Sequence, residues 1–200
     1  MALNANALVS VELAKAHLKI PSADTTQTPI IELLINMTSQ HIENYCSRSF
    51  KSRSVTRYYD GTNQKNVLLG EYPVNSITAV YIDNDRDFDE PTALISPTEY
   101  AVIDEEVLRR HDYFWPTGSQ NIKVEMNVGF VEIPSDLQWA TLQILEQAYR
   151  GNQDRRVGRR NTSKGDESVT YLDSWPFDAI AIIDMYKNIT FGGRTRPESV

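Results

Sequence analysis

The stretch Val124–Arg150, VEMNVGFVEIPSDLQWATLQILEQAYR, holds the clearest structural signals in this chain. Its first residues alternate between apolar and polar side chains as far as Gly129, which is typical of a half-buried strand. Ser135 and Gln138 then fit a capping box, in which Ser135 caps a helix and Gln138 reaches back to it. Gly151 follows at the place of a C-terminal cap. The stretch therefore predicts a strand over 122–128 and an amphipathic helix over 136–150.

Two further helices are predicted before residue 50. Ser10 is a good N-cap for a helix over 10–20, which Pro21 stops. A longer helix over 29–46 has Thr28 as its cap and Pro29 at its first position. Its apolar surface is broad enough to indicate burial on more than one side, between neighbouring subunits or under a sheet. One stripe consists of Ile31, Leu34, Ile35, Thr38, Ile42 and Tyr45, and beside it lie Ile30, Leu33 and Met37.

Residues 54–128 change from helical to alternating periodicity, which predicts five or six short strands. Within them, Tyr100–Ile103 and Val107–Arg110 are expected to pair as a hairpin. The fold class is therefore α+β, with a framework of about four helices and a β-rich middle. We expect one α+β domain over 1–150. Residues 151–200 would add a mobile basic loop, a short helix after Pro176 and a docking tail.

The composition limits the classes of function. The formal net charge is −7, whereas a general duplex-DNA binder usually has a basic excess. Cys46 is the only cysteine, so no disulfide forms within the chain. No run reaches the roughly 18 apolar residues of a membrane span, and MALNANALVS lacks the basic region of a secretory signal. These features predict an ordinary protein with no membrane partner.

The search for a catalytic or metal site gives none. The acidic run 83–90 lacks the glycine and the closing glutamate of a calcium loop, so we interpret it as a solvated loop. His17, His41 and His111 are not at metal-ligand spacing, and Cys46 has no activating base near it in sequence. No nucleophile elbow, phosphate loop or dinucleotide motif is present. We therefore predict no catalytic residue, no metal, no cofactor and no enzyme activity.

One cluster of charge remains as a candidate contact site. It consists of Arg150, Arg155, Arg156, Arg159 and Arg160, with only Asp154 among them. Arginine binds phosphates and carboxylates through two parallel hydrogen bonds. Three interpretations stay open: a solvated loop, contact with an acidic partner protein, or contact with DNA phosphate.

Four motifs, in order, resemble one family. They are Ala14-Lys15-Ala16-His17-Leu18, then Ile42-Glu43-Asn44-Tyr45 with Arg48, then Pro73–Val80 (PVNSITAV), and the stretch Val124–Arg150 quoted above. Residues 171–188, YLDSWPFDAIAIIDMYKN, are similar to the closing helix of the same family. Across residues 8–186 the chain resembles phage head-tail connector proteins, also called adaptor or head completion proteins.

This resemblance implies a structural virion protein with no catalytic residues. Such an adaptor forms a homo-oligomeric ring beneath the portal and extends the DNA channel toward the tail. Its implied partners are the portal protein, a downstream tail or stopper protein, and the packaged DNA that passes through. Its implied location is the virion neck, at the head-tail interface, after assembly in the host cytoplasm.

Two alternatives come from other classes. A metal-dependent phage enzyme acting on nucleic acid or cell wall would use carboxylates such as Asp83, Asp85 and Asp87. A DNA-binding regulator would use the arginine cluster.

Overall fold

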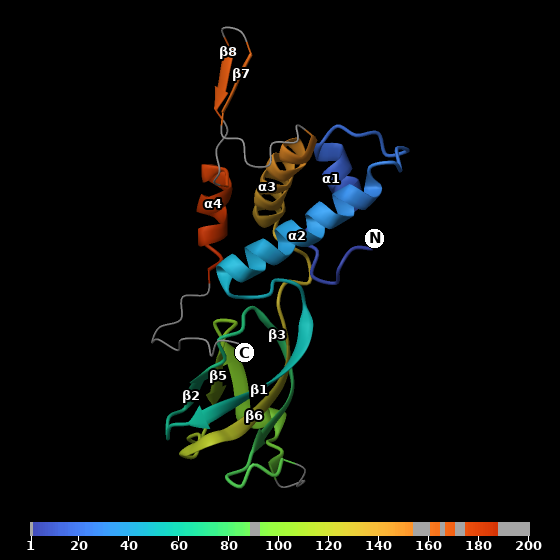
Figure 1. The fold of residues 1–200 in the computed structure, drawn as a ribbon. Coiled ribbons are helices and arrows are strands. Elements are labelled where there is room, and N and C mark those ends of the chain that lie inside the picture. The colour runs from blue at the N-terminus through green and yellow to red at the C-terminus, as the bar shows by residue number, and fades with distance from the viewer. Residues whose placement is uncertain (1, 89–92, 154–160, 165–166, 171–174, 188–200) are drawn as a thin grey trace. The chain divides into compact units, whose positions relative to one another are not determined.

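The computed structural model describes residues 2–88, 93–153, 161–164, 167–170 and 175–187. The chain folds as two compact units, drawn in Figure 1. The helical unit contains the described residues of Met1–Phe50 and Glu132–Ile189, and the strand unit contains those of Lys51–Val131. The strand unit is thus inserted in the sequence of the helical unit. The α+β fold class is confirmed, whereas the division at residue 150 stays a prediction.

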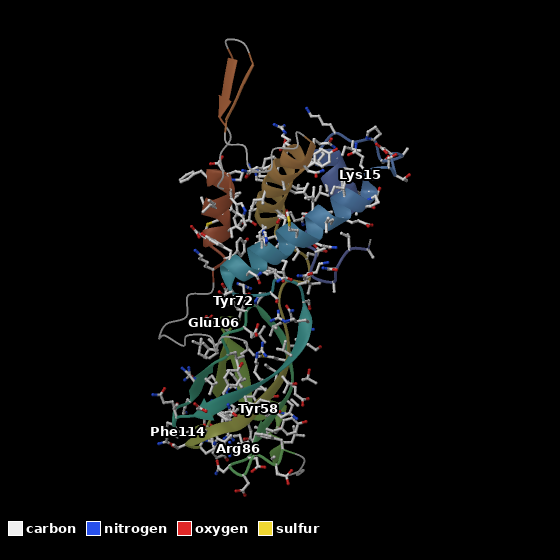
Figure 2. The ribbon with its side chains drawn as sticks, viewed as in Figure 1. Lys15, Tyr58, Tyr72, Arg86, Glu106 and Phe114 are labelled. Atoms are coloured by element: carbon white, nitrogen blue, oxygen red, sulfur yellow. The ribbon has the colours of Figure 1, made fainter. Side chains whose placement is uncertain are left out.

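Four helices build the described part of the helical unit: α1 (Val11–His17), α2 (Thr28–Cys46), α3 (Ser135–Gln153) and α4 (Phe177–Asp184). The predicted cap of α1 is confirmed, since the Ser10 hydroxyl accepts a hydrogen bond from the Leu13 N–H at 3.2 Å. The helix ends three residues earlier than predicted, because the backbone turns left-handed at Lys19 with φ 57°. Lys15, labelled in Figure 2, is buried and donates to the Asp24 carbonyl at 2.8 Å, which fixes the following loop.

The start of α2 differs from the prediction by one residue. Gln27 occupies the capping position without a side-chain hydrogen bond, and Thr28 is already helical. The reason is that the Gln27 carbonyl accepts the first helical bond, from the Ile31 N–H at 3.1 Å. The predicted end at Cys46 is confirmed, where Ser47 adopts a left-handed conformation with φ 53°.

Both predicted ends of α3 are wrong in detail. Ser135 is the first helical residue and not the cap, because the Pro134 carbonyl accepts the bond from the Gln138 N–H at 3.0 Å. The Gln138 side chain donates to the Ile133 carbonyl at 2.8 Å and so does not close a capping box on Ser135. Gly151 lies within the helix rather than after it. The extra turn is held by Gln153, whose amide donates to the Tyr149 hydroxyl at 2.9 Å.

The helical core joins the start of the chain to α2 and α3. Its buried members are Ala7, Val9, Ala14, Ile31, Leu34, Ile35, Leu142 and Leu145. The predicted short helix after Pro176 is confirmed as α4, with Ala179 and Ile183 buried. The Tyr186 hydroxyl donates to Asp136 at 2.7 Å and thereby ties the residues after α4 to the first turn of α3.

The strand unit consists of two three-stranded antiparallel sheets, of order β1-β6-β3 and β2-β5-β4. Its strands are β1 (Arg53–Gly61), β2 (Asn66–Leu68), β3 (Val74–Ile82), β4 (Tyr100–Ile103), β5 (Val107–Arg110) and β6 (Gly118–Val128). The predicted hairpin is confirmed as β4 and β5, with Tyr100 opposite Arg110. Both sheets contribute to one core, made of Val67, Leu69, Val80, Tyr100, Leu108, Trp115, Ile122, Val124, Met126 and Val128.

Residues 151–170 were predicted to be part of a mobile basic loop, and the structure places two strands within them: β7 (Asn161–Lys164) pairs antiparallel with β8 (Glu167–Thr170). The mobility of this segment stays a prediction. The dipeptide between the two strands, Gly165-Asp166, is of a kind favoured in two-residue hairpins, so a local signal was present. Within the described residues, no helix has both the length and the apolar character needed to cross a bilayer.

Candidate functional site

The predicted arginine cluster is described only at its first member. Arg150 lies in the last turns of α3 and forms an ion pair with Glu146, one turn earlier. Its side chain is 68% exposed, so it is accessible to a partner. Arg155, Arg156, Arg159 and Arg160 lie outside the described residues. Contact of this cluster with protein or DNA therefore stays a prediction.

Arg150 belongs to a larger surface on α1 and α3, which we call the Trp139 patch. It consists of the exposed Leu13, Trp139 and Arg150 and the partly buried His17 and Glu146. The Glu146 carboxylate contacts the His17 ring at 2.9 Å as well as the Arg150 guanidinium. The Trp139 ring meets the His17 ring edge-on, with centroids 5.4 Å apart, yet Trp139 is still 49% exposed. Leu13 lies one turn before His17 on α1 and is also exposed. An aromatic anchor with a charged rim suits a protein interface.

An exposed apolar surface lies on α2 and consists of Leu33 and Met37, and we call it the Leu33 patch. These residues are 42% and 39% exposed, while the neighbouring Leu34 is buried in the helical core. Residues 33 and 37 are one turn apart and lie on the side of α2 roughly opposite Ile31 and Ile35. The patch is therefore turned away from the core of its own unit.

The first residues of the chain cover one flank of α2 but leave the Leu33 patch open. The Asn4 N–H donates to the Asn36 side chain at 2.9 Å, and the Leu8 N–H donates to the Ser39 hydroxyl at 3.0 Å. The Asn6 amide donates to Glu43 at 2.8 Å. These contacts cover polar residues of α2, so the predicted burial of its apolar surface between subunits or under a sheet stays a prediction. Burial of Leu33 and Met37 against another subunit stays a prediction.

The acidic run behaves as a turn where the structure describes it. The Asp83 carboxylate accepts a hydrogen bond from the Asp85 N–H at 2.9 Å, which closes a local turn. Asp89 and Glu90 lie outside the described residues. Among the residues that are described, no group of three or more His, Cys, Asp or Glu side chains is placed to hold a metal ion.

Cys46 is placed as a packed thiol rather than as a nucleophile. It is 1% exposed, and its sulfur contacts the Ile183 carbonyl at 3.6 Å. Burial raises the pKa of the Cys46 thiol to about 11, so the reactive thiolate is disfavoured at neutral pH. His41 and His111 are exposed, and His17 contacts Glu146 and Trp139.

A family model described as "Head completion protein" matches residues 7–189 of this chain. The chain belongs to the head completion protein family. The resemblance seen in the sequence motifs is thereby confirmed, and it extends through α4. No individually curated protein matches the chain.

Solved structures with the same fold come from gene transfer agent (GTA) particles. A chain of the "Virion of native gene transfer agent (GTA) particle" is 14% identical with a TM-score of 0.62, and the match covers 97% of this chain and 96% of that one. A chain of the "Neck of empty GTA particle computed with C6 symmetry" is 17% identical with a TM-score of 0.61, covering 98% and 97%. A third, from the "Neck of native GTA particle computed with C12 symmetry", is 16% identical with a TM-score of 0.57, covering 98% and 100%. At such low identity the likeness establishes the fold.

Membership of the head completion family assigns the chain a structural and not an enzymatic role. We therefore expect the functional surfaces to be those that contact other proteins, and sequence analysis identified them only in part. It placed Arg150 correctly on α3 but did not select Trp139. The signal was available, because residues 139, 146 and 150 share a helix face distinct from the predicted core face.

Proposed function

We propose that this head completion protein is a head-tail adaptor in the neck of a phage or phage-like particle. It would form a ring beneath the portal and extend the DNA channel toward the tail. The observation that carries the proposal is the family match over residues 7–189. The fold shared with chains from GTA particles, two of them from reconstructions of the neck, supports this location.

A homo-oligomeric ring is supported by the surfaces of the helical unit. A cyclic ring joins two different surfaces of each subunit, head to tail. The Leu33 patch is an exposed apolar surface, and the Trp139 patch surrounds the exposed Leu13 and Trp139 with charged side chains. The two lie on different helices, so one copy offers both halves of such an interface. The six-fold and twelve-fold symmetries named for the two GTA necks agree with a ring.

The remaining partners are the portal, a downstream tail or stopper protein and the packaged DNA. We propose that the arginine cluster of Arg150, Arg155, Arg156, Arg159 and Arg160 docks on carboxylates of the portal or of a neighbouring subunit. The net charge of −7 favours a channel wall that lets DNA pass without holding it. Assembly would take place in the host cytoplasm, and no membrane is involved.

The proposal is tested by measuring particle mass in solution, with and without purified portal protein. We expect a ring-sized species in the presence of portal. Replacing Leu33 and Met37 by Asp should prevent the ring while leaving the subunit folded, because both side chains are exposed in the subunit. The matched control replaces Leu68 by Asp, since Leu68 is an exposed leucine on the other unit. If the particle mass does not change when portal protein is added, at any concentration tested, the proposal is contradicted.

The docking role of the arginines needs its own measurement. Replacing Arg155, Arg156, Arg159 and Arg160 together by Ala should weaken incorporation into particles and leave affinity for free duplex DNA nearly unchanged. Affinity should be measured at two salt concentrations. A large, salt-dependent loss of DNA affinity would move the cluster to the phosphate-contact interpretation, and normal incorporation would remove the docking role.

A further inference from the structure

The two sheets of the strand unit leave one seam between them open. β1 is an edge of the sheet β1-β6-β3, and β2 is an edge of the sheet β2-β5-β4. A slot of about 400 Å³ lies between these edges, and its walls are Tyr58–Asp60, Thr62, Asn66–Leu68, Ser119 and Gln120. At the other seam, between β3 and β4, the Ile95 N–H donates to the Val80 carbonyl at 2.8 Å. Among the described residues, the edges of β1 and β2 have no strand partner.

The hydrogen bonds of β2 show which of its backbone groups face the slot. The Leu69 N–H donates to the Glu106 carbonyl at 2.9 Å. In an antiparallel pair only alternate residues direct their backbone groups at the partner strand, so Val67 is also turned toward β5. Asn66 and Leu68 therefore present their N–H and C=O groups to the open edge, which the slot borders.

The edges of β1 and β2 are too far apart to pair with each other. The Tyr59 hydroxyl donates to the Leu69 carbonyl at 2.7 Å, so a tyrosine side chain spans the distance between them. Paired strands lie only about 4.8 Å apart. Leu68 is 61% exposed, which leaves the edge of β2 accessible. Such an edge can accept a strand from another chain.

The β7–β8 hairpin is a second element without a sheet to join. Its two strands pair with each other and form a separate two-stranded sheet (Figure 1). A single two-stranded hairpin is at best marginally stable in water and needs a third strand or other packing. The residue types of Asn161, Lys164 and Glu167 are depleted in strands, so the sequence adds little stability. We therefore expect the hairpin to have a partner.

Charge distinguishes the two strands of the hairpin. Residues 155–164, which end in β7, contain four Arg and one Lys and no acidic residue, whereas β8 begins with Glu167. Residues 51–131 of the strand unit contain eight Lys and Arg against thirteen Asp and Glu, a net charge of −5. Asp60 is the only charged residue in the walls of the slot. Charge complementarity thus favours β7, rather than β8, beside the slot.

We propose that β7 of one copy of this chain adds to the open edge of β2 in a second copy. Hydrogen bonds to the backbone of Asn66 and Leu68 would provide the affinity. The four residues of β7 suit the three of β2 in length. A second copy is the occupant because one chain by itself leaves both the hairpin and the edge of β2 without a further strand in the described residues. The inference rests on the proposed association of copies in a ring, and it names two strands that would join neighbouring copies.

The first test measures amide hydrogen exchange at β2 in the ring assembled with portal protein. The variant replaces residues 161–170 by a Gly-Ser linker of equal length, which removes the hairpin but no residue of the two cores described above. The Asn66 and Leu68 amides should exchange about tenfold faster in this variant, because their acceptors on β7 are lost. The Val67 amide faces β5, so its unchanged exchange is the internal control.

The second test shows which molecule supplies the strand, and it needs no portal protein. The linker variant, labelled with an isotope, is mixed with rising concentrations of unlabelled Leu68→Pro chains. These chains keep the hairpin but lack one N–H at the open edge of β2, so their hairpins stay available. Exchange of the labelled Asn66 and Leu68 amides should slow by about tenfold at saturation, and only the other molecule can cause this. If Leu68→Pro fails to fold, Asn66→Pro takes its place.

The third test examines charge in the same mixture. Lys164→Glu in the unlabelled chain should raise the concentration needed for protection about threefold, because it places a carboxylate on the strand that approaches the acidic strand unit. Lys19→Glu is the matched control. It makes the same change of charge at an exposed lysine of the helical unit, and it should leave the protection unchanged.

The results that contradict this inference differ from those that contradict the adaptor role. If copies assemble on portal but the linker variant leaves exchange at Asn66 and Leu68 unchanged, the hairpin does not join them and the adaptor role stands. If the whole chain shows protection that does not depend on protein concentration, while the mixture shows none, β7 pairs within its own chain and the inference is wrong. If no copies assemble on portal, the adaptor role is wrong. The mixture then decides alone, and an absence of protection contradicts the inference.

Discussion

Asn121 makes more long-range hydrogen bonds through its side chain than its place in a strand suggests. It is completely buried, and its amide oxygen accepts from the Gly61 N–H at 2.9 Å. Its amide nitrogen donates to the Asn84 side chain at 2.9 Å and to the Pro116 carbonyl at 3.0 Å. One side chain thus joins the end of β1 to two loops. A buried amide that lost these partners would cost free energy, so the residues around it are tightly constrained.

Gly61, which donates a hydrogen bond to Asn121, has no room for a side chain. A Cβ atom there would lie 1.7 Å from the Pro116 carbonyl oxygen, so Gly61→Ala should cost about 3 kcal/mol or more in free energy of unfolding. The control is Gly70→Ala, where φ is +66° but no atom lies within 4 Å of the added carbon. That variant should lose only about 1–2 kcal/mol, for its backbone conformation alone. Urea denaturation of both variants checks this, and equal losses would contradict the steric argument.

The buried thiol of Cys46 predicts a pH dependence. Its pKa is raised by burial from 9.0 to about 11 in the folded chain. Between these values the unfolded thiol releases a proton that the folded thiol keeps, so stability is lost as the pH rises through this window. The free energy of unfolding should therefore fall more steeply from pH 9 to pH 11 in the natural chain than in Cys46→Ala. Other alkaline groups are common to both proteins. Parallel pH profiles would show that the thiol does not contribute.

At the scale of elements, local signals predicted most of the helices and strands, but not every helix end and not the contacts between distant residues. The β4–β5 hairpin was predicted residue for residue, because period-two alternation and its turn are both local. The prediction that Ser135 caps α3 was wrong, because the Pro134 carbonyl accepts the first hydrogen bond of the helix. The bonds of Asn121 could not be predicted, because its partner Gly61 is 60 residues away. The shared helix face of Trp139, Glu146 and Arg150 could be read from the sequence, but the contact of Trp139 with His17 could not, because it depends on how α1 packs on α3.

Two adjacent leucines of α2 test the assignment of its faces. Leu34 is buried in the helical core, so Leu34→Ala should cost about 2–5 kcal/mol in free energy of unfolding. Leu33 is 42% exposed, so Leu33→Ala should change subunit stability by less than about 1 kcal/mol. The denaturation midpoints of the two variants should be compared in the unassembled chain, and only that of Leu34→Ala should fall strongly. Similar midpoints would mean that the helix is rotated from the position described.

At the end of α3, one substitution is expected to raise the stability of the chain rather than lower it. Gly151 lies within the helix, and nothing lies within 4 Å of a Cβ atom added to it. Gly151→Ala should therefore stabilise the chain, by up to about 1 kcal/mol, because alanine has the higher helix propensity. If Gly151 instead capped the helix in a left-handed conformation, its replacement by Ala would lower the stability. Thermal unfolding and helix content by circular dichroism distinguish the two cases.

At the scale of the whole molecule, two cores share one chain. The helical core uses residues from both sides of the insertion, such as Ile35 and Leu145, while the strand core lies entirely within residues 51–131. Sequence periodicity identifies each element but does not state which elements share a core. Division into units is therefore information that only long-range packing supplies.

The strand unit should fold without the rest of the chain. Among the described residues, its core consists of ten buried side chains between residues 67 and 128, including Trp115 at 0% exposure. A chain of residues 51–131 should show cooperative unfolding and a blue-shifted Trp115 fluorescence that moves to longer wavelength in urea. The Trp115→Phe variant provides the spectroscopic baseline. Gradual, non-cooperative loss of signal would show that the unit depends on its neighbour.

The insertion of one unit within the other sets an order of events during protein synthesis. α2 leaves the ribosome early, but its buried partners Leu142 and Leu145 are translated about a hundred residues later. At elongation rates of about 5–20 residues per second, this separation is a wait of roughly 5–20 s. During it, the strand unit emerges complete and can fold, whereas Ile31, Leu34 and Ile35 remain exposed on the nascent chain. We therefore expect α2 to be the segment that a ribosome-associated chaperone would bind, until α3 is synthesised and covers its apolar side chains.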